Sequence, residues 1–213
     1  MKKLEVLAIC TISYILVLGD MRFALPKIKS TAKMSRITSG QFLKAWLDTI
    51  EEKKEFLSAD WRNAKAFTYL VKGCEDNLIK LVADKLSLKC YPNDYYSIDS
   101  ILYDDKGLVP GIPENSYWFR EIKVAFEHEN NFRSGLYKEV SHLLLVNSDL
   151  KVLVTYPNDD TTNEMNYLHR LIKETRIQKD LSDSESFLVI FGYETNFEWE
   201  AFVYKEDEWK QIL

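Results

Sequence analysis

The sequence has little glycine, proline, cysteine or histidine, and each scarcity excludes a class of protein. With 7 Gly and 5 Pro among 213 residues, the chain is neither collagen-like nor of low complexity. A glycine-rich phosphate loop and a dinucleotide-binding glycine fingerprint have almost no place in it. The sequence has no Cys-x-x-Cys pair and no Cys/His cluster, which argues against a structural zinc site. It also has no Ser/His/Asp constellation that would indicate a nucleophilic hydrolase.

The three cysteines are Cys10, Cys74 and Cys90. A disulfide between Cys74 and Cys90 is one alternative. The odd number and the wide spacing favour the other, which is reduced and buried thiols. Reduced thiols are typical of a cytoplasmic protein, and we therefore expect that location.

Composition places the chain among ordinary globular proteins. Hydrophobic residues make up 46% and charged residues 29%, and 13% aromatic residues exclude wholesale disorder. The length is sufficient for one domain with a sizeable core. The 28 basic and 33 acidic residues give a net charge of -5, which argues against a protein that binds nucleic acid by coating its phosphates. An enzyme that acts on nucleic acid is not excluded, because its carboxylates would be needed to hold metal ions.

The N-terminal segment, residues 1–33, differs from the rest. Two lysines precede an apolar run from Val6 to Gly19. Three alternatives fit it: translation that starts at Met34, a signal peptide, and a membrane anchor. The run is shorter than the ~20 residues that a spanning helix needs. We expect a single domain over residues 34–213, and membrane association only if the apolar segment is an anchor.

The remainder predicts an α/β fold, with a mixed central sheet covered by helices. Hydrophobic periodicity and turn residues predict these elements. The predicted helices cover residues 41–57, 59–88, 134–147 and 161–178. The predicted strands cover residues 95–103, 117–129, 151–156, 187–193 and 199–204.

Three carboxylates stand out on the predicted strands. Glu127 and Glu129 are two residues apart, so both project from one face, opposite the apolar Val124 and Phe126. Asp99 interrupts a strand in which aspartate is uncommon. If the two strands pair, Asp99 and Glu127 meet. Neighbouring carboxylates are tolerable when a cation lies between them or when both reach water.

A fourth carboxylate belongs to the predicted helix 59–88. At the helical period Glu75 falls within the apolar stripe that contains Val71, Ile79 and Val82. A buried glutamate without a partner would be costly. We therefore expect Glu75 to face a polar pocket or a cation.

These acids, followed by a helix and a core strand, resemble the PD-(D/E)XK nuclease-like superfamily, whose fold is also called restriction-endonuclease-like. The resemblance covers about residues 60–157. It implies that Asp99 and Glu127 bind Mg²⁺ or Mn²⁺, with Glu75 or Glu129 as further ligands. It also implies metal-assisted hydrolysis of the phosphodiester bonds of DNA.

The chain departs from that motif at one position. The family has a lysine two residues after the motif glutamate, where it helps to orient the attacking water; here the position is Glu129. The role could pass to Lys138 on the following helix or to Lys123 on the strand. Lys123 lies about 13 Å from Glu127 along an extended strand, which is too far to act at the same metal. We therefore predict Lys138 as the catalytic lysine, together with Asp99, Glu127 and Glu129.

Plainer interpretations stand beside these. Glu127 and Glu129 could form a solvated strand face, and Glu139 with His142 an ordinary polar helix face. His128 alternates with Phe126 and is predicted to be a partly buried core histidine. A second hypothesis is an inactive nuclease-fold protein that binds a protein partner as an interaction or regulatory module. The acidic charge and the missing motif lysine favour it. Geometry discriminates between the two hypotheses. Carboxylates of Asp99 and Glu127 within a few Å of each other, with Glu75 or Glu129 nearby in a cleft, would favour the enzyme. Carboxylates that diverge across the sheet would exclude it.

Overall fold

The computed structural model describes residues 36–213, except 74, 92, 114–115, 134 and 159. Arg36–Leu213 forms one compact unit. The helical elements are α1 (Ser39–Glu52), α2 (Lys54–Asp60), α3 (Ala64–Thr68), the π-helical η1 (Tyr69–Gly73), α4 (Leu78–Lys85), the 3₁₀ turn η2 (Asp105–Gly107), α5 (Leu136–Leu145), α6 (Thr162–Lys173) and α7 (Gln178–Ser184). The strands are β1 (Lys89–Cys90), β2 (Ser100–Tyr103), β3 (Val124–Glu129), β4 (Leu150–Thr155), β5 (Phe187–Tyr193), β6 (Glu198–Lys205) and β7 (Glu208–Gln211).

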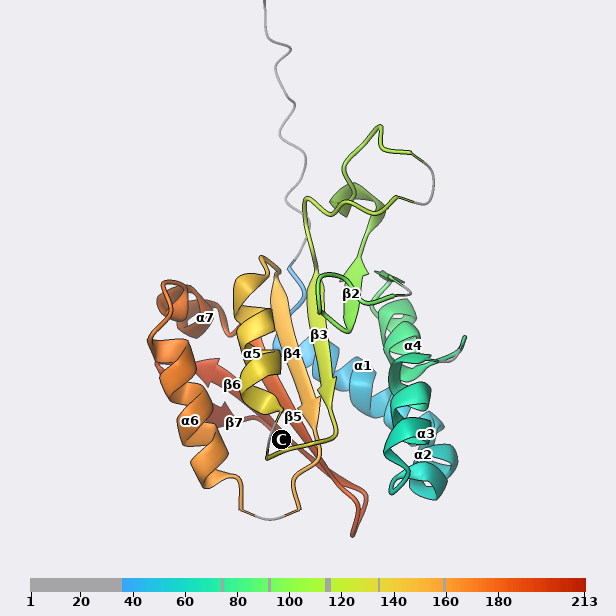
Figure 1. The fold of residues 1–213 in the computed structure, drawn as a ribbon, viewed down its shortest axis with the longest axis vertical. Helices are drawn as coiled ribbons and strands as arrows, with labels where there is room; N and C mark the ends of the chain where they lie inside the picture. Colours follow the sequence, from blue (N-terminus) through green and yellow to red (C-terminus); the bar gives the residue numbers. More distant parts are fainter. Residues whose placement is uncertain (1–35, 74, 92, 114–115, 134, 159) are drawn as a thin grey trace, which may run out of the picture. The chain divides into compact units, whose positions relative to one another are not determined.

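The strands form one seven-stranded mixed sheet whose spatial order follows the chain from β1 to β7. The central strands β3, β4 and β5 are parallel, and the outer pairs are antiparallel. Parallel neighbours need a crossover connection. Helix α5 makes the first crossover, and α6 with α7 makes the second (Figure 1). The predicted α/β class, with a mixed sheet flanked by helices, is confirmed.

Each face of the sheet has its own core. Residues of α1 to α4 pack on one face, and α5, α6 and α7 pack on the other (Figure 1). The alternation along β3 follows this division: Val124 and Phe126 belong to the first core, while Ala125 belongs to the second. Glu127, two residues after Ala125, therefore points into the layer that α5 covers. This placement brings a carboxylate beneath a helix.

The predicted helix 59–88 is wrong as a single element. The side-chain oxygen of Asn63 accepts a hydrogen bond from the Ala66 N–H, and that of Asn77 accepts one from the Lys80 N–H. Asparagine at such positions starts a new helix by satisfying the free N–H groups of its first turn. The end of α2, followed by α3, η1 and α4, therefore occupies this part of the chain.

The predicted strand 95–103 is shorter than expected. Tyr95 and Ile98 close a tight turn on themselves, with positive φ at Tyr96 and Ser97. Such φ values are incompatible with an extended strand. Strand β2 therefore begins at Ser100, directly after Asp99.

Other boundaries differ more simply. The predicted strand 117–129 begins only at Val124, because Phe119 pairs back with Leu108 in the preceding loop. The predicted helix 161–178 ends at Lys173, and α7 follows as a separate helix. The short strands β1 and β7 were not predicted, whereas β5 covers the predicted residues.

Within the described residues, no helix is long and apolar enough to cross a membrane. The predictions for residues 1–33, for Cys10 and for Cys74 lie outside the described residues. Cys90 has a free thiol and is half-buried. Burial raises the pKa of this thiol to about 11, so it is protonated and unreactive at neutral pH.

Candidate metal centre

Asp99 and Glu127 meet at the point where β2 pairs with β3. The antiparallel register places Ser100 opposite Phe126, so the residues just outside this pair are neighbours. The Asp99 N–H donates to Glu127 Oε2 at 3.3 Å, and the His128 N–H donates to Asp99 Oδ2 at 2.8 Å. Each carboxylate thus accepts a backbone hydrogen bond from the other strand. The prediction that Asp99 and Glu127 meet if their strands pair is confirmed.

Lys72 supplies a positive charge beside these acids. Its ammonium donates to Asp99 Oδ1 and lies 3.7 Å from Asp94 Oδ1. Burial acts to lower the pKa of Lys72, but the hydrogen bond and the charge of Asp99 act against burial, and the pKa is raised. Lys72 therefore remains a cation at neutral pH. It comes from η1, a π-helical turn of a kind often found at functional sites.

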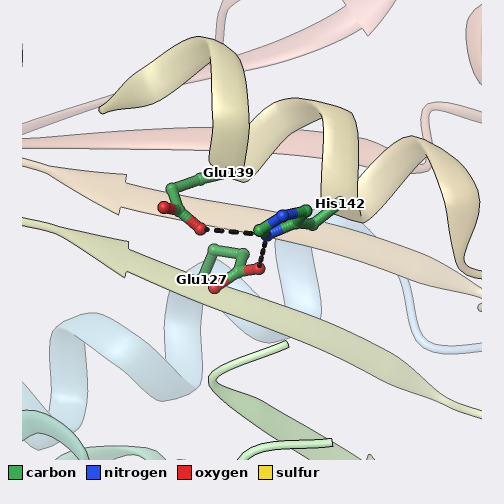
Figure 2. Close-up of side chains that lie close together, drawn as sticks. All are labelled: Glu127, Glu139 and His142. Atoms are coloured by element: carbon green, nitrogen blue, oxygen red, sulfur yellow. Dashed lines mark ion pairs between the residues drawn. The ribbon is translucent and has the colours of Figure 1, made fainter. Parts of the chain in front are cut away.

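On the other side of Glu127, helix α5 contributes two further side chains (Figure 2). Nδ1 of His142 lies 3.6 Å from Glu127 Oε1 and 3.4 Å from Glu139 Oε2. One ligand atom from each of the three residues lies within 4.8 Å of the others. Glu127 is fully buried, and neither its Oε1 nor His142 Nδ1 has a hydrogen-bond partner among the described residues. These unpartnered atoms face each other across the group.

Without a cation, the surroundings disfavour the ionised forms of the two carboxyl groups. Burial raises the pKa of Glu127 to about 10, and the charges of Asp99 and Glu139 act in the same direction. Burial is also the largest cause of the raised pKa of Glu139, and the charge of Asp99 is the next. Carboxyl groups in such surroundings hold protons unless a positive charge replaces them. A bound divalent cation would stabilise the ionised forms and release those protons.

Two of the three separations between these ligand atoms match those around one metal ion, and the third is at most 4.8 Å. Zinc lies about 2.0–2.2 Å from nitrogen and carboxylate ligands, which places neighbouring ligands of a tetrahedral site roughly 3.3–3.5 Å apart. The separations of 3.6 and 3.4 Å from His142 Nδ1 are close to this value. An imidazole with two carboxylates suits Mn²⁺ or Zn²⁺ better than Mg²⁺, which prefers oxygen ligands and keeps several waters.

The remaining predicted ligands lie elsewhere. Glu75 is exposed in the turn before α4, and its backbone carbonyl accepts a hydrogen bond from Lys80 Nζ. The expectation that Glu75 lies within an apolar helical stripe is wrong, because the helix is interrupted there. Glu129 is half-buried and accepts a hydrogen bond from the Asn131 N–H at 2.5 Å. Its charge helps to raise the pKa of Glu139.

Neither lysine considered for the catalytic role bonds to these acids. Lys138 is exposed on α5, and among the described residues it forms no ion pair with them; its charge alone acts on Glu139. Lys123 is buried and binds Glu121 and Asp149. The ammonium that contacts the centre belongs to Lys72.

The sequence analysis did not identify Glu139 and His142 as neighbours of Glu127, or Lys72 as the partner of Asp99. Glu139 and His142 carried a usable pattern, because residues three apart on a helix lie on the same face. The prediction for His128 is confirmed: it is a buried core histidine whose Nε2 lies 3.0 Å from the Tyr156 hydroxyl.

A cleft of about 520 Å³ opens beside this centre. Lys72 and Asp99 line it together with Lys65 and Tyr69, whose side chain is 59% exposed. The cleft therefore joins basic side chains and an aromatic ring to the edge of the acidic group. In proteins that bind nucleic acids, phosphates commonly contact basic side chains and nucleobases stack on aromatic rings.

No family model, curated protein or solved structure matches this chain. The class that the structure itself establishes is an α/β protein with a seven-stranded mixed sheet. Its candidate site lies between β2, β3, η1 and α5.

Proposed function

We propose that this protein is a metal-dependent hydrolase of phosphodiester bonds in DNA, built on a restriction-endonuclease-like core. The order of β2, β3, α5 and β4 supports the proposal, since it repeats the order of elements in the constellation that suggested the family. The meeting of Asp99 with Glu127 supports it further. The observation that carries the proposal is the buried Glu127 carboxylate, whose unpartnered Oε1 faces Glu139 and His142.

Glu127, Glu139 and His142 are the residues that would hold the metal. A divalent ion bound there supplies Lewis acidity and a water of lowered pKa. Mn²⁺ is the ion we expect to support the highest activity, because one of the three ligands is an imidazole.

Lys72 takes the role that the motif lysine has in the family. Its ammonium lies at the boundary between the acids and the cleft, where it can contact a phosphate while Asp99 keeps it oriented. Lysine is a common phosphate ligand because it offers a compact positive charge. Tyr69 and Lys65 provide further contacts for a nucleic-acid strand in the cleft. A cytoplasmic location accords with this activity and with the free thiol of Cys90.

A non-catalytic interaction module is the second candidate. Two exposed aromatic side chains favour it: Tyr96 is 86% and Trp118 is 66% exposed. Tyrosine and tryptophan are enriched among the residues that dominate protein interfaces. The ion pair of Lys72 with Asp99, which satisfies one acid without a metal, also accords with this function.

Cleavage assays on the full chain distinguish the two candidates. Supercoiled plasmid and labelled oligonucleotides are incubated with Mg²⁺ or Mn²⁺ and wild type, Glu127→Gln or Glu198→Gln. Glu198 is exposed on β6, away from the centre, and makes the matched control. We expect Mn²⁺-dependent cleavage that falls at least ~100-fold in Glu127→Gln and persists in Glu198→Gln.

The other outcomes are equally informative. Equal cleavage by wild type and Glu127→Gln would attribute the activity to a contaminant and refute the proposal. Absence of cleavage with either metal, on every substrate, would leave the interaction module. Titration calorimetry with Mn²⁺ alone then shows whether the centre binds metal independently of catalysis.

A further inference from the structure

A second cavity of about 520 Å³ lies apart from the metal centre. It is bounded by the C-terminal end of α5, by the start of β4 and by α7. Its lining includes two basic residues, Arg36 and Lys151, and three serines, Ser148, Ser184 and Ser186. None of these residues takes part in the proposed hydrolysis.

Lys151 is the unusual member of this lining. It is 4% exposed, and its ammonium donates to Ser148 Oγ at 3.3 Å. Among the described residues no carboxylate forms an ion pair with it. An ammonium buried without a counter-ion is costly, and proteins normally pair such a group.

The charged groups around Lys151 do not supply the missing partner. Arg36 adds a second positive charge; its Nε donates to the Asp149 backbone carbonyl at 3.0 Å. The Asp149 carboxylate lies 3.2 Å from Lys123 Nζ and is therefore already paired. Asp180 and Asp183 of α7 line the cavity without forming an ion pair with Lys151. Burial, then the charge of Arg36, lowers the pKa of Lys151 to about 8, and Asp149 opposes this only in part.

The cavity wall adds an apolar component. Leu144, Val146, Ile177 and Leu181 line it, and the neighbouring Leu145 is 86% exposed. The carbonyl end of α5 is favourable for a cation, which gives Lys151 some compensation. That compensation does not account for the second positive charge of Arg36, or for the cavity that both basic side chains line.

We propose that this cavity is a binding site for an organic oxyanion, with Lys151 and Arg36 binding the anionic group and the leucine-rich wall an apolar substituent. The observation that carries the proposal is that these two basic side chains line one cavity and form no ion pair within the described part of the chain. A phosphate monoester and a carboxylate are both oxyanions that these two basic side chains could bind. Phenyl phosphate, benzoate and inorganic phosphate are therefore used as separate probes.

Binding is measured on the full chain by titration calorimetry at pH 7 with wild type, Lys151→Met, Arg36→Gln and Lys173→Met. Lys173 is exposed at the end of α6 and provides the same chemical change outside the cavity. We expect Lys151→Met to weaken binding roughly tenfold or more, Arg36→Gln to weaken it less, and Lys173→Met to leave it unchanged. Tighter binding of phenyl phosphate than of inorganic phosphate would support a contribution of the apolar wall to binding.

A second measurement needs no variant. The lysine ε-methylene resonance of wild type that titrates near pH 8 is followed by NMR with and without phenyl phosphate. An upward shift of its midpoint supports the site, because a bound anion favours the ammonium form. Equal affinity of wild type and Lys151→Met, or no binding of any probe together with an unmoved midpoint, would overturn the proposal.

Discussion

Glu127 is the residue on which the candidate centre depends. One of its oxygens accepts the Asp99 N–H, and the other faces His142 without a hydrogen bond. Its pKa of about 10 means that the metal-free protein carries this side chain as a neutral acid. Glutamine has nearly the same shape as a protonated glutamate, and this gives a sensitive test of metal binding.

We predict that Glu127→Gln changes the free energy of unfolding by no more than ~1 kcal/mol in the presence of a chelator, because a neutral group replaces a neutral group. The same change removes the stabilisation by Mn²⁺, which for wild type at one hundred times its Kd is about 2.7 kcal/mol. Urea denaturation with chelator and with Mn²⁺ measures both values. Stabilisation of the variant by Mn²⁺ to the same extent as wild type would exclude Glu127 as a ligand.

Lys151 predicts a pH dependence of stability. Its folded-state pKa of about 8 is below the ordinary lysine value of 10.5, so from pH 8 to 10.5 the unfolded chain binds more protons than the folded one. The free energy of unfolding of wild type should therefore rise relative to Lys151→Met across this interval, by at most about 3 kcal/mol. Below pH 8 both states are protonated, and the cost of the buried charge is fully present. Urea denaturation of both proteins at several pH values measures the difference; a constant difference would contradict the prediction.

At the scale of elements, two asparagine caps divide the α2 to α4 region and thereby place Lys72. Asn63 starts α3, which continues into η1 and carries the Lys72 ammonium to Asp99. Asn77 starts α4 after the turn that contains Glu75. An unbroken helix would place different side chains toward β2, so the caps determine which residues reach the acids.

Removal of the first cap tests this element. Asn63→Ala should lower the free energy of unfolding by about 1 kcal/mol, because the Ala66 N–H loses its acceptor. Asn63→Asp retains an acceptor oxygen and should stay close to wild type. Chemical denaturation of wild type and the two variants measures these free energies of unfolding. Equal stability of the alanine and aspartate variants would show that the cap contributes nothing.

At the scale of the whole molecule, the net charge of -5 opposes association with DNA. In the cleft Lys65 and Lys72 balance the charges of Asp94 and Asp99, so the repulsion is weaker there. If the protein binds DNA as proposed, we expect few phosphate contacts and therefore weak, short-lived binding.

The dependence of DNA affinity on salt concentration measures the number of phosphate contacts. With about two phosphates neutralised by Lys65 and Lys72, the plot of log affinity against log salt should have a slope of about -2. Fluorescence anisotropy with a labelled duplex, at several salt concentrations and with Ca²⁺ in place of Mn²⁺, provides the slope. A slope of about -6 or steeper would indicate an extensive basic surface and contradict this description.

Much of the fold could be predicted because short-range patterns determine it. The alternation of Val124 and Phe126 with Ala125 and Glu127 divides β3 between two faces, whatever covers them. The apolar run Phe187–Tyr193 predicts a buried strand at its observed boundaries. Helix boundaries near Asn63 were missed because the apolar pattern continues across the cap.

The sequence by itself determined the α/β class and the strand face that Glu127 shares with Glu129, because period-two alternation is a local property. It made the meeting of Glu127 with Asp99 conditional on the pairing of their strands, which the tertiary structure supplies. Only the tertiary structure decided which groups complete the site. Lys72 reaches Asp99, which lies 27 positions further along the chain, and His142 reaches Glu127 only when α5 packs over β3. Such contacts depend on how elements pack in three dimensions, and no spacing along the chain specifies that packing.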